Sequence, residues 1–339
     1  MSETRRLHAT SDPQEARKVF ETALFEVKRV IVGQEEMLER VFVALLAEGH
    51  VLLEGVPGLA KTLTIKAVSE VLGGSFKRIQ FTPDLVPSDL VGTRIYRADG
   101  GRFDTELGPV FCNFLLADEI NRAPAKVQSA LLEVMQEHQV TIGPQTYPVQ
   151  DPFLVLATQN PIESEGTYPL PEAQVDRFMF KIAIDYPSDR EEVSIVDRSL
   201  AEPAEIEQVL SPELLASYQE LTRDVFVDRR VSEYAVALVG ATRRPRDVGL
   251  EELEPYIEFG ASPRGSINMI HGGRALALLR GRGYVVPDDI RALARDVMRH
   301  RIVLTYEALA DGLDADALLD KVLDAVEAPE ISLSRVEAA

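Results

Sequence analysis

The chain has 339 residues and a formal net charge of −19, with one cysteine and no tryptophan. The acidic excess opposes non-specific binding to nucleic acid and to anionic membranes, and Cys112 alone cannot form an intramolecular disulfide. The N-terminus lacks the apolar stretch of a signal peptide, and no run of about 18 apolar residues indicates a membrane span. These features predict a cytosolic globular protein without membrane insertion, with Cys112 in the core.

The first predicted elements along the chain are helices. Apolar residues recur at helical spacing from Asp12 to Ala47, around an interruption at Gly33. Five apolar-rich segments then follow, several of them nearly unbroken, as is typical of buried parallel strands. They begin at His50, Phe76, Phe111, Phe153 and Phe178. Helical patterns at 61–72 and 125–137 separate some of these segments, which favours crossover connections and a wound parallel sheet.

Two segments do not fit this alternation of strands and helices. Residues at about 91–107 and 139–150 place β-forming residues around a glycine-containing turn, which predicts two inserted hairpins. From Ser188 onward, acid-rich amphipathic helical patterns dominate. We therefore expect an α/β core of residues 1–187, built on a parallel sheet, followed by a smaller all-α domain of residues 188–339.

The segment GVPGLAKT lies directly after an apolar strand and directly before a helix. This context is typical of a phosphate-binding loop, whose backbone N–H groups and helix N-terminus surround a polyphosphate. Lys61 would reach the β- and γ-phosphates of ATP, and the Thr62 hydroxyl would bind Mg²⁺. Ala60 stands where the general pattern has glycine, so nucleotide affinity depends on whether this position needs a positive φ. The predicted binding residues are Gly55, Val56, Pro57, Gly58, Leu59, Ala60, Lys61, Thr62 and Leu63.

Polar side chains follow two of the predicted strands at their carboxyl ends, where ligands bind in such sheets. Asp118 could hold Mg²⁺, and Glu119 could act as the general base toward the attacking water. Asn160 could orient that water or contact the γ-phosphate. Taken singly, these residues are more typical of solvated turns and turn caps. The upstream loop favours the catalytic interpretation.

Two arginines and two histidines complete the candidate residues. Arg177 precedes the last strand, and Arg264 lies at a predicted helix start in the second domain. The guanidinium group suits phosphate because its donors are fixed and always charged, although a lone arginine more often forms a surface salt bridge. His138 and His271 show no metal-ligand spacing and are interpreted as structural or exposed.

At this point the sequence resembles the MoxR-type AAA+ ATPases, in the helix-2-insert branch that includes magnesium-chelatase-like motors. The stretches that carry the resemblance are EGVPGLAKT, LLADEINRAPAKVQSALLEVMQE, ATQNPIESEGTYPLPEAQVDRF and GASPRG. The resemblance implies that Asn160 is sensor 1, that Arg177 is the arginine finger for a neighbouring subunit's ATP, and that Arg264 is sensor 2. It places Gly33 near the adenine. It also suggests that Arg122 contacts a neighbouring subunit, with a cap or surface role equally open.

The resemblance further implies a P-loop AAA+ core with a helical lid, bound ATP and Mg²⁺, and a hexameric ring with nucleotide at the subunit junctions. The two hairpins would face the pore or a partner. Such motors work as chaperones on a client, often with a von Willebrand A domain protein; the sequence identifies neither. A nucleic-acid motor or loader is an alternative, opposed by the charge and by the lack of basic, aromatic-interleaved runs. A second alternative is a nucleotide-dependent scaffold with little ATP turnover. The presence of Glu119, Asn160 and Arg177 argues against it.

Overall fold

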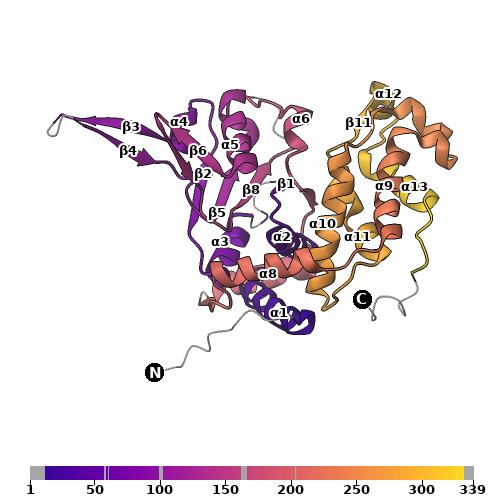
Figure 1. The fold of residues 1–339 in the computed structure, drawn as a ribbon, viewed down its shortest axis with the longest axis horizontal. Coiled ribbons are helices and arrows are strands. Elements are labelled where there is room, and N and C mark those ends of the chain that lie inside the picture. The colour runs from indigo at the N-terminus through magenta and orange to yellow at the C-terminus, as the bar shows by residue number, and fades with distance from the viewer. Residues whose placement is uncertain are drawn as a thin grey trace.

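The structure, a computed structural model, describes residues 12–56, 59, 61–98, 102–161, 166–202 and 204–331. An α/β core and a helical part lie side by side (Figure 1). The core is built on a five-stranded sheet in the order β2-β5-β8-β1-β9, and all its paired strands are parallel. Its strands are β1 (Val51–Gly55), β2 (Phe76–Gln80), β5 (Phe114–Asp118), β8 (Leu154–Gln159) and β9 (Phe180–Ile184). Each lies within one of the five apolar segments, which confirms the predicted parallel sheet.

Both faces of the sheet are covered by helices, which explains why β1, β5 and β8 are nearly unbroken apolar runs, whereas the edge strand β2 is largely polar and exposed. Neighbouring residues of a strand point to opposite faces, and Val51 and Leu53 of β1 accordingly join one buried cluster while Leu52 joins another. The first cluster includes residues of α1 (Pro13–Val30), α2 (Glu35–Leu46) and α3 (Lys61–Leu72). The second includes residues of α4 (Pro87–Val91) and α5 (Ala125–Glu137).

The two predicted hairpins are confirmed. The first pairs β3 (Gly92–Arg97) with β4 (Arg102–Leu107), and the second pairs β6 (Gln139–Ile142) with β7 (Gln145–Pro148), both antiparallel. Figure 1 shows β3 and β4 projecting away from the body of the core. Tyr96 and Phe103 pack against each other across this hairpin with tilted rings whose centroids are 5.2 Å apart, and both remain more than half exposed.

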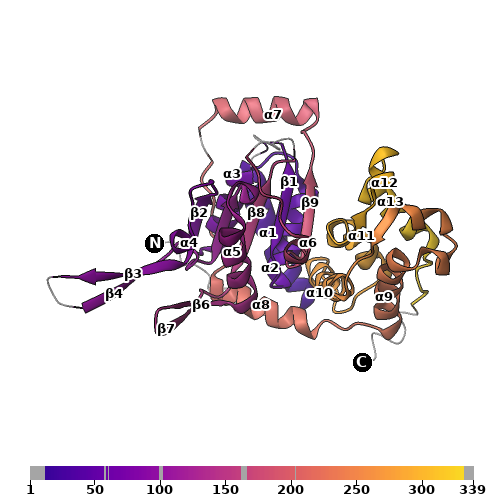
Figure 2. The ribbon, with the colours of Figure 1, turned by 90° about the horizontal axis from the view of Figure 1, so that it is seen from above.

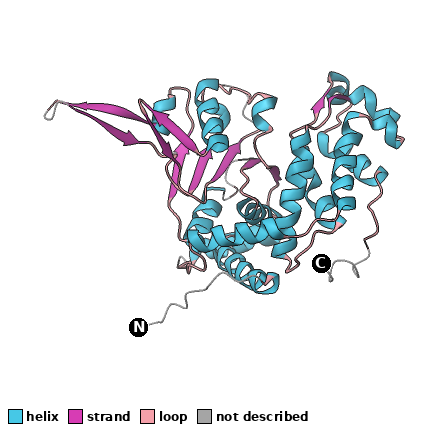
Figure 3. Cartoon of the chain, viewed as in Figure 1, coloured by secondary structure: helices cyan, strands magenta, loops and turns pink. Residues whose placement is uncertain are grey.

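The rest of the described chain is mostly helical (Figures 2 and 3). Its α-helices are α6 (Glu172–Val175), α7 (Asp189–Leu200), α8 (Pro212–Asp224), α9 (Arg229–Arg243), α10 (Pro263–Leu279), α11 (Pro287–Met298), α12 (Tyr306–Ala310) and α13 (Ala315–Ala325). Short 3₁₀ turns are η1 (Ile120–Arg122), η2 (Pro245–Val248) and η3 (Glu251–Tyr256). A small ladder of β10 (Ile257–Phe259) and β11 (Val303–Leu304) adds to the predicted all-α arrangement.

The predicted domain boundary between residues 187 and 188 stays a prediction. The helical part is tied to the core by a buried ion pair, in which Arg40 of α2 contacts Asp296 of α11 at 2.7 Å. The same guanidinium donates to the carbonyl oxygen of Ala292 at 2.7 Å. Burial raises the pKa of Asp296, opposed by Arg299 and Arg40. A buried pair is costly to break, so this joint fixes α11 against the core.

Two further sequence predictions can be compared with the structure. Cys112 is fully buried, and burial raises the pKa of its thiol to about 12, so the prediction of a core cysteine is confirmed. Within the described ranges, none of the helices combines the length and apolar character that crossing a lipid bilayer requires.

Candidate nucleotide site

The carboxyl ends of the parallel strands meet at one edge of the sheet and bring several predicted residues together. Asp118 ends β5, and Asn160 directly follows β8 and is buried. The Thr158 hydroxyl donates to Oδ1 of Asp118 at 2.6 Å and accepts the N–H of Glu119 at 2.8 Å. The carboxyl ends of β5 and β8 are therefore linked by hydrogen bonds at the predicted catalytic residues.

Lys61 begins α3 and faces this group of carboxylates. Its Nζ donates to the carbonyl oxygen of Gly55, at the end of β1. Burial lowers the pKa of Lys61, whereas the charges of Asp118, Glu119 and Glu54 act in the opposite direction. The ammonium group is therefore held at the strand ends, where a polyphosphate would meet it. Of the predicted loop, Pro57, Gly58 and Ala60 lie outside the described residues, so the effect of Ala60 stays open.

The oxygen donors at this edge fit a magnesium ion. Asp118 offers a carboxylate and Thr62 a hydroxyl, and Mg²⁺ prefers such hard oxygen ligands together with phosphate and water. Arg78 of β2 contacts Oδ2 of Asp118 at 2.7 Å, so a bound cation would compete with this guanidinium. The sequence alone does not point to Arg78, because its contact with Asp118 depends on β2 and β5 lying side by side in the sheet.

Glu119 is held in an uncommon backbone conformation with its carboxylate already engaged. Its φ is +56°, in the left-handed region that costs a non-glycine residue about 1–3 kcal/mol. Oε2 accepts a hydrogen bond from Gln80 and forms an ion pair with Nε of Arg122, each at 2.8 Å. Both contacts are made to Oε2, so they orient the carboxylate and leave the lone pairs of Oε1 unused by these two partners. Arg122, whose role the sequence left open, pairs with Glu119 within the chain.

An apolar cavity of about 590 Å³ lies beside the phosphate-binding loop, under α7. Its apolar lining includes Ile31, Val32, Leu59, Leu63 and Ile195. The volume falls in the range of small-molecule sites, and the lining suits a flat base. Gly33 has φ +66°, a backbone conformation that favours glycine, and a Cβ there would first meet the movable end of the Glu191 side chain. The neighbouring Gln34 lines the cavity, as the predicted position of Gly33 near an adenine would need.

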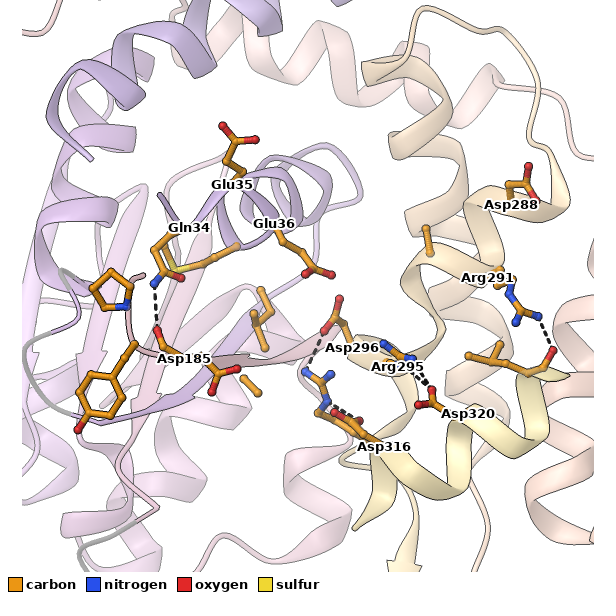
Figure 4. A pocket seen from close by; sticks show the side chains of 18 of the residues that line it. Gln34, Glu35, Glu36, Asp185, Asp288, Arg291, Arg295, Asp296, Asp316 and Asp320 are labelled. Atoms are coloured by element: carbon orange, nitrogen blue, oxygen red, sulfur yellow. Dashed lines mark hydrogen bonds and ion pairs between the residues drawn. The ribbon is translucent and has the colours of Figure 1, made fainter. Parts of the chain in front are cut away.

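A larger cleft of about 820 Å³ separates the core from the helical part (Figure 4). Nine carboxylates and three arginines line it. Each arginine is paired, Arg291 with Asp324, Arg295 with Asp320, and Arg299 with Asp296 and Asp316. The remaining negative charge would repel a triphosphate. The smaller apolar cavity, lined by Leu59 and Leu63, is therefore the better candidate for a nucleotide site.

The two predicted arginines lie together, but at the opposite edge of the sheet. Arg177 precedes β9 by three positions, at its amino end, and lines a cavity of about 330 Å³ with Arg264. Arg264 is the second residue of α10 and lies 3.7 Å from Asp176, with its side chain 44% exposed. Because β1 pairs with β9 in parallel over five residues, about 16 Å of strand separates the two edges. Neither arginine is placed at the carboxyl edge of its own chain.

Comparisons with known proteins bear on this geometry. Residues 50–180 match the ATPase family associated with various cellular activities (AAA), and residues 251–322 match the AAA lid domain. The chain is 56% identical to Chaperone MoxR1 of Mycobacterium tuberculosis over 92% of this chain and 83% of that protein. The chain belongs to the MoxR family of AAA+ ATPases. Protein MoxR of Methylorubrum extorquens is 32% identical over 90% of this chain and 93% of that protein.

Solved structures place this MoxR-family chain in the same fold. The crystal structure of a candidate ATPase from Cytophaga hutchinsonii matches with a TM-score of 0.88 and 46% identity, covering 94% of this chain and 97% of that one. The expected architecture of an AAA+ parallel-sheet core with a helical lid is therefore confirmed. The roles of the individual site residues stay predictions.

In this MoxR-family chain, sequence reasoning missed the residues that support the predicted site. Thr158 joins Asp118 to Glu119, and Gln80 contacts Glu119. Thr158 was visible as a polar residue inside an apolar strand, two positions before Asn160. Asp176 was visible as the neighbour of Arg177. Its partners in the lid are far away in the sequence, so only the folded chain reveals them.

Proposed function

We propose that this chain is an ATP-hydrolysing motor that works as a chaperone and uses Mg²⁺. The observation that carries the proposal is the division of the site between two edges of one sheet. The carboxyl edge holds Lys61, Asp118 and Glu119, whereas the amino edge presents Arg177 and Arg264. A single chain cannot bring both sets to one nucleotide. Two copies arranged head to tail can.

At the carboxyl edge, this chain's residues would bind ATP and orient the attacking water. The apolar cavity would hold the base, and Lys61 would contact the β- and γ-phosphates. Thr62 and Asp118 would hold Mg²⁺, which supplies charge neutralisation on the phosphates when bound. Glu119, oriented by Gln80 and Arg122 through Oε2, would accept the proton of the water. Asn160, buried at the end of β8, would orient the water or contact the γ-phosphate.

At the amino edge, Arg177 and Arg264 would contact the ATP of the neighbouring subunit. Their guanidinium donors stabilise the charge that develops during phosphoryl transfer. A head-to-tail contact of this kind is heterologous, and it closes into a ring when the rotation permits. We propose a homo-oligomeric, hexameric ring with one nucleotide at each junction. The cytosolic location predicted from the sequence stays a prediction.

The ring would convert ATP turnover into remodelling of a client protein complex. The similarity to a protein named Chaperone MoxR1 supports this part of the proposal. A partner with a von Willebrand A domain follows from the family resemblance alone. The β3–β4 hairpin, with its exposed Tyr96 and Phe103, is the surface that we expect to contact a partner or client.

The experiment is phosphate release with ATP and Mg²⁺ over a range of protein concentrations. We expect specific activity to rise with concentration because each site needs a neighbour. Glu119→Gln should bind ATP without turning it over. Concentration-independent turnover, together with a harmless Arg177→Ala change, would contradict a shared site. A nucleotide-dependent scaffold predicts instead that Glu119→Gln changes neither turnover nor partner binding.

A further inference from the structure

Asp176 lies directly before Arg177, and three side chains from the helical part contact its carboxylate. The Ser262 hydroxyl donates to its two carboxylate oxygens at 3.0 and 3.1 Å. Arg301 donates from Nε to Oδ1 at 2.8 Å, and Arg264 lies 3.7 Å from Oδ2. Ser262 and Arg301 are 86 and 125 positions away along the chain. The cluster is therefore a tertiary joint between lid and core.

Arg301 also holds the backbone on both sides of Arg177. Its Nη2 donates to the carbonyl oxygen of Asp176 at 2.9 Å and to that of Phe178 at 2.7 Å. Its Nη1 donates to the carbonyl oxygen of Met179 at 3.3 Å. The side chain is fully buried, and burial lowers its pKa to about 10, so it stays protonated at neutral pH. A planar guanidinium with several fixed donors is well suited to fixing a backbone turn.

We propose that Arg301 and Asp176 are positioning residues for Arg177 and Arg264. This inference rests on the proposed function, in which the two arginines contact a neighbouring subunit's ATP. Arg301 fixes the backbone that presents Arg177, and Asp176 fixes the helix start that presents Arg264. Both arginines are thereby attached to the lid and to the core at once. A displacement of the lid would move both of them relative to the neighbouring nucleotide.

Arg299 provides a matched control because it also connects the lid to the core. Its Nη1 donates to the carbonyl oxygen of Lys181 in β9 at 2.8 Å, and it pairs with Asp316 at 2.9 Å. Its side chain is only 13% exposed. Arg299 does not, however, bond to the carbonyl oxygens that flank Arg177. A change to lysine at each position keeps the charge and removes the planar fork.

The test compares Arg301→Lys with Arg299→Lys in the full-length protein. We expect Arg301→Lys to lower kcat about tenfold or more, because small misplacements of catalytic groups are costly. The KM for ATP should change little, since the variant's own carboxyl edge is intact. Arg299→Lys should keep a kcat close to that of the wild type. Equal kcat values for the two variants would overturn the proposal.

A mixing experiment separates positioning from general damage to the fold. Arg301→Lys subunits keep an intact Glu119, whereas Glu119→Gln subunits keep an intact Arg177 face. We expect a mixture of the two to hydrolyse more ATP than the sum of the separate proteins. Damage to the fold would leave the mixture without this gain and would overturn the proposal. Asp176→Asn should behave in the same way, and it replaces Arg301→Lys if that variant does not fold.

Failure of this inference is distinguishable from failure of the proposed function. If the wild type shows no concentration-dependent hydrolysis, the shared site itself is wrong. If the wild type is active and Arg177→Ala gains activity on mixing with Glu119→Gln, the shared site stands. An Arg301→Lys variant that then behaves like Arg299→Lys would refute only the positioning role.

Discussion

The two edges of the central sheet are built in different ways. At the carboxyl edge, each candidate residue stands at a strand end or helix start, and the side chains that contact Asp118 and Glu119 come from neighbouring strands of the core sheet and from the turn after β5. At the amino edge, Asp176 and Arg177 are joined to Ser262 and Arg301, which lie in distant parts of the chain. Changes at the carboxyl edge therefore stay within the core, whereas changes at the amino edge also affect the lid.

The largest expected effect is at the amino edge. Arg177→Ala should lower kcat by about 10³-fold or more, because an arginine that stabilises the transferred phosphoryl group is worth about that factor. Nucleotide binding by the same chain should persist, since its carboxyl edge is unchanged. Phosphate release and binding of a fluorescent ATP analogue measure the two properties. Arg229→Ala, at a side chain that is 90% exposed, is the control.

The next effect is at the carboxyl edge. Glu119→Gln should reduce turnover about 10²- to 10⁴-fold by removing the general base. The amide can still accept a hydrogen bond from Gln80, so the fold should be kept. ATP should therefore stay bound, which filter binding of labelled nucleotide can detect. If the variant hydrolyses ATP at the wild-type rate and retains no bound ATP, Glu119 is not the general base.

A smaller effect is expected at Thr158, whose hydroxyl forms hydrogen bonds with the Asp118 carboxylate and with the N–H of Glu119. Thr158→Val keeps the shape but loses both hydrogen bonds. Residues that orient metal ligands typically contribute about 10- to 100-fold to metal affinity or activity. We therefore expect a higher Mg²⁺ concentration for half-maximal turnover. An unchanged Mg²⁺ titration would show that Thr158 does not orient Asp118.

The smallest effect concerns stability at the amino edge. His50 accepts the N–H of Val155 and contacts the carbonyl oxygen of Met135, and burial lowers its pKa to about 4. The unfolded chain binds this proton at about pH 6.5. Stability should therefore fall as pH decreases from about 6.5 to about 4, by at most about 3 kcal/mol from this group. Denaturant unfolding at several pH values tests this, and His50→Gln should flatten the dependence.

Much of the fold could be predicted from the sequence because its signals are local. Apolar-rich segments predicted the five strands, and β-forming residues around glycine-containing turns predicted the two hairpins. The carboxyl edge could also be predicted, since parallel strands bring Asp118 and Asn160 to one edge whatever the details of packing. The bonds from Gln80 and Arg78 could not be predicted, because they depend on strand order and register.

The contacts at the amino edge could not be predicted from the sequence, for a physical reason. Nothing near Arg177 in the sequence indicates that Arg301 bonds to the carbonyl oxygens on both sides of it. The resemblance named Arg264 as a lid residue, but only the fold places it beside Arg177 and away from its own chain's phosphate-binding loop. Contacts between segments more than 80 positions apart leave no periodic pattern in the sequence.

The most direct test of the shared site mixes two inactive proteins. Arg177→Ala subunits keep an intact carboxyl edge, and Glu119→Gln subunits keep an intact amino edge. In a random mixture of equal parts, half of the sites are intact and half of those face an intact neighbour, so about one quarter of wild-type hydrolysis should return. A mixture no more active than the sum of its parts would contradict a site shared between the two edges.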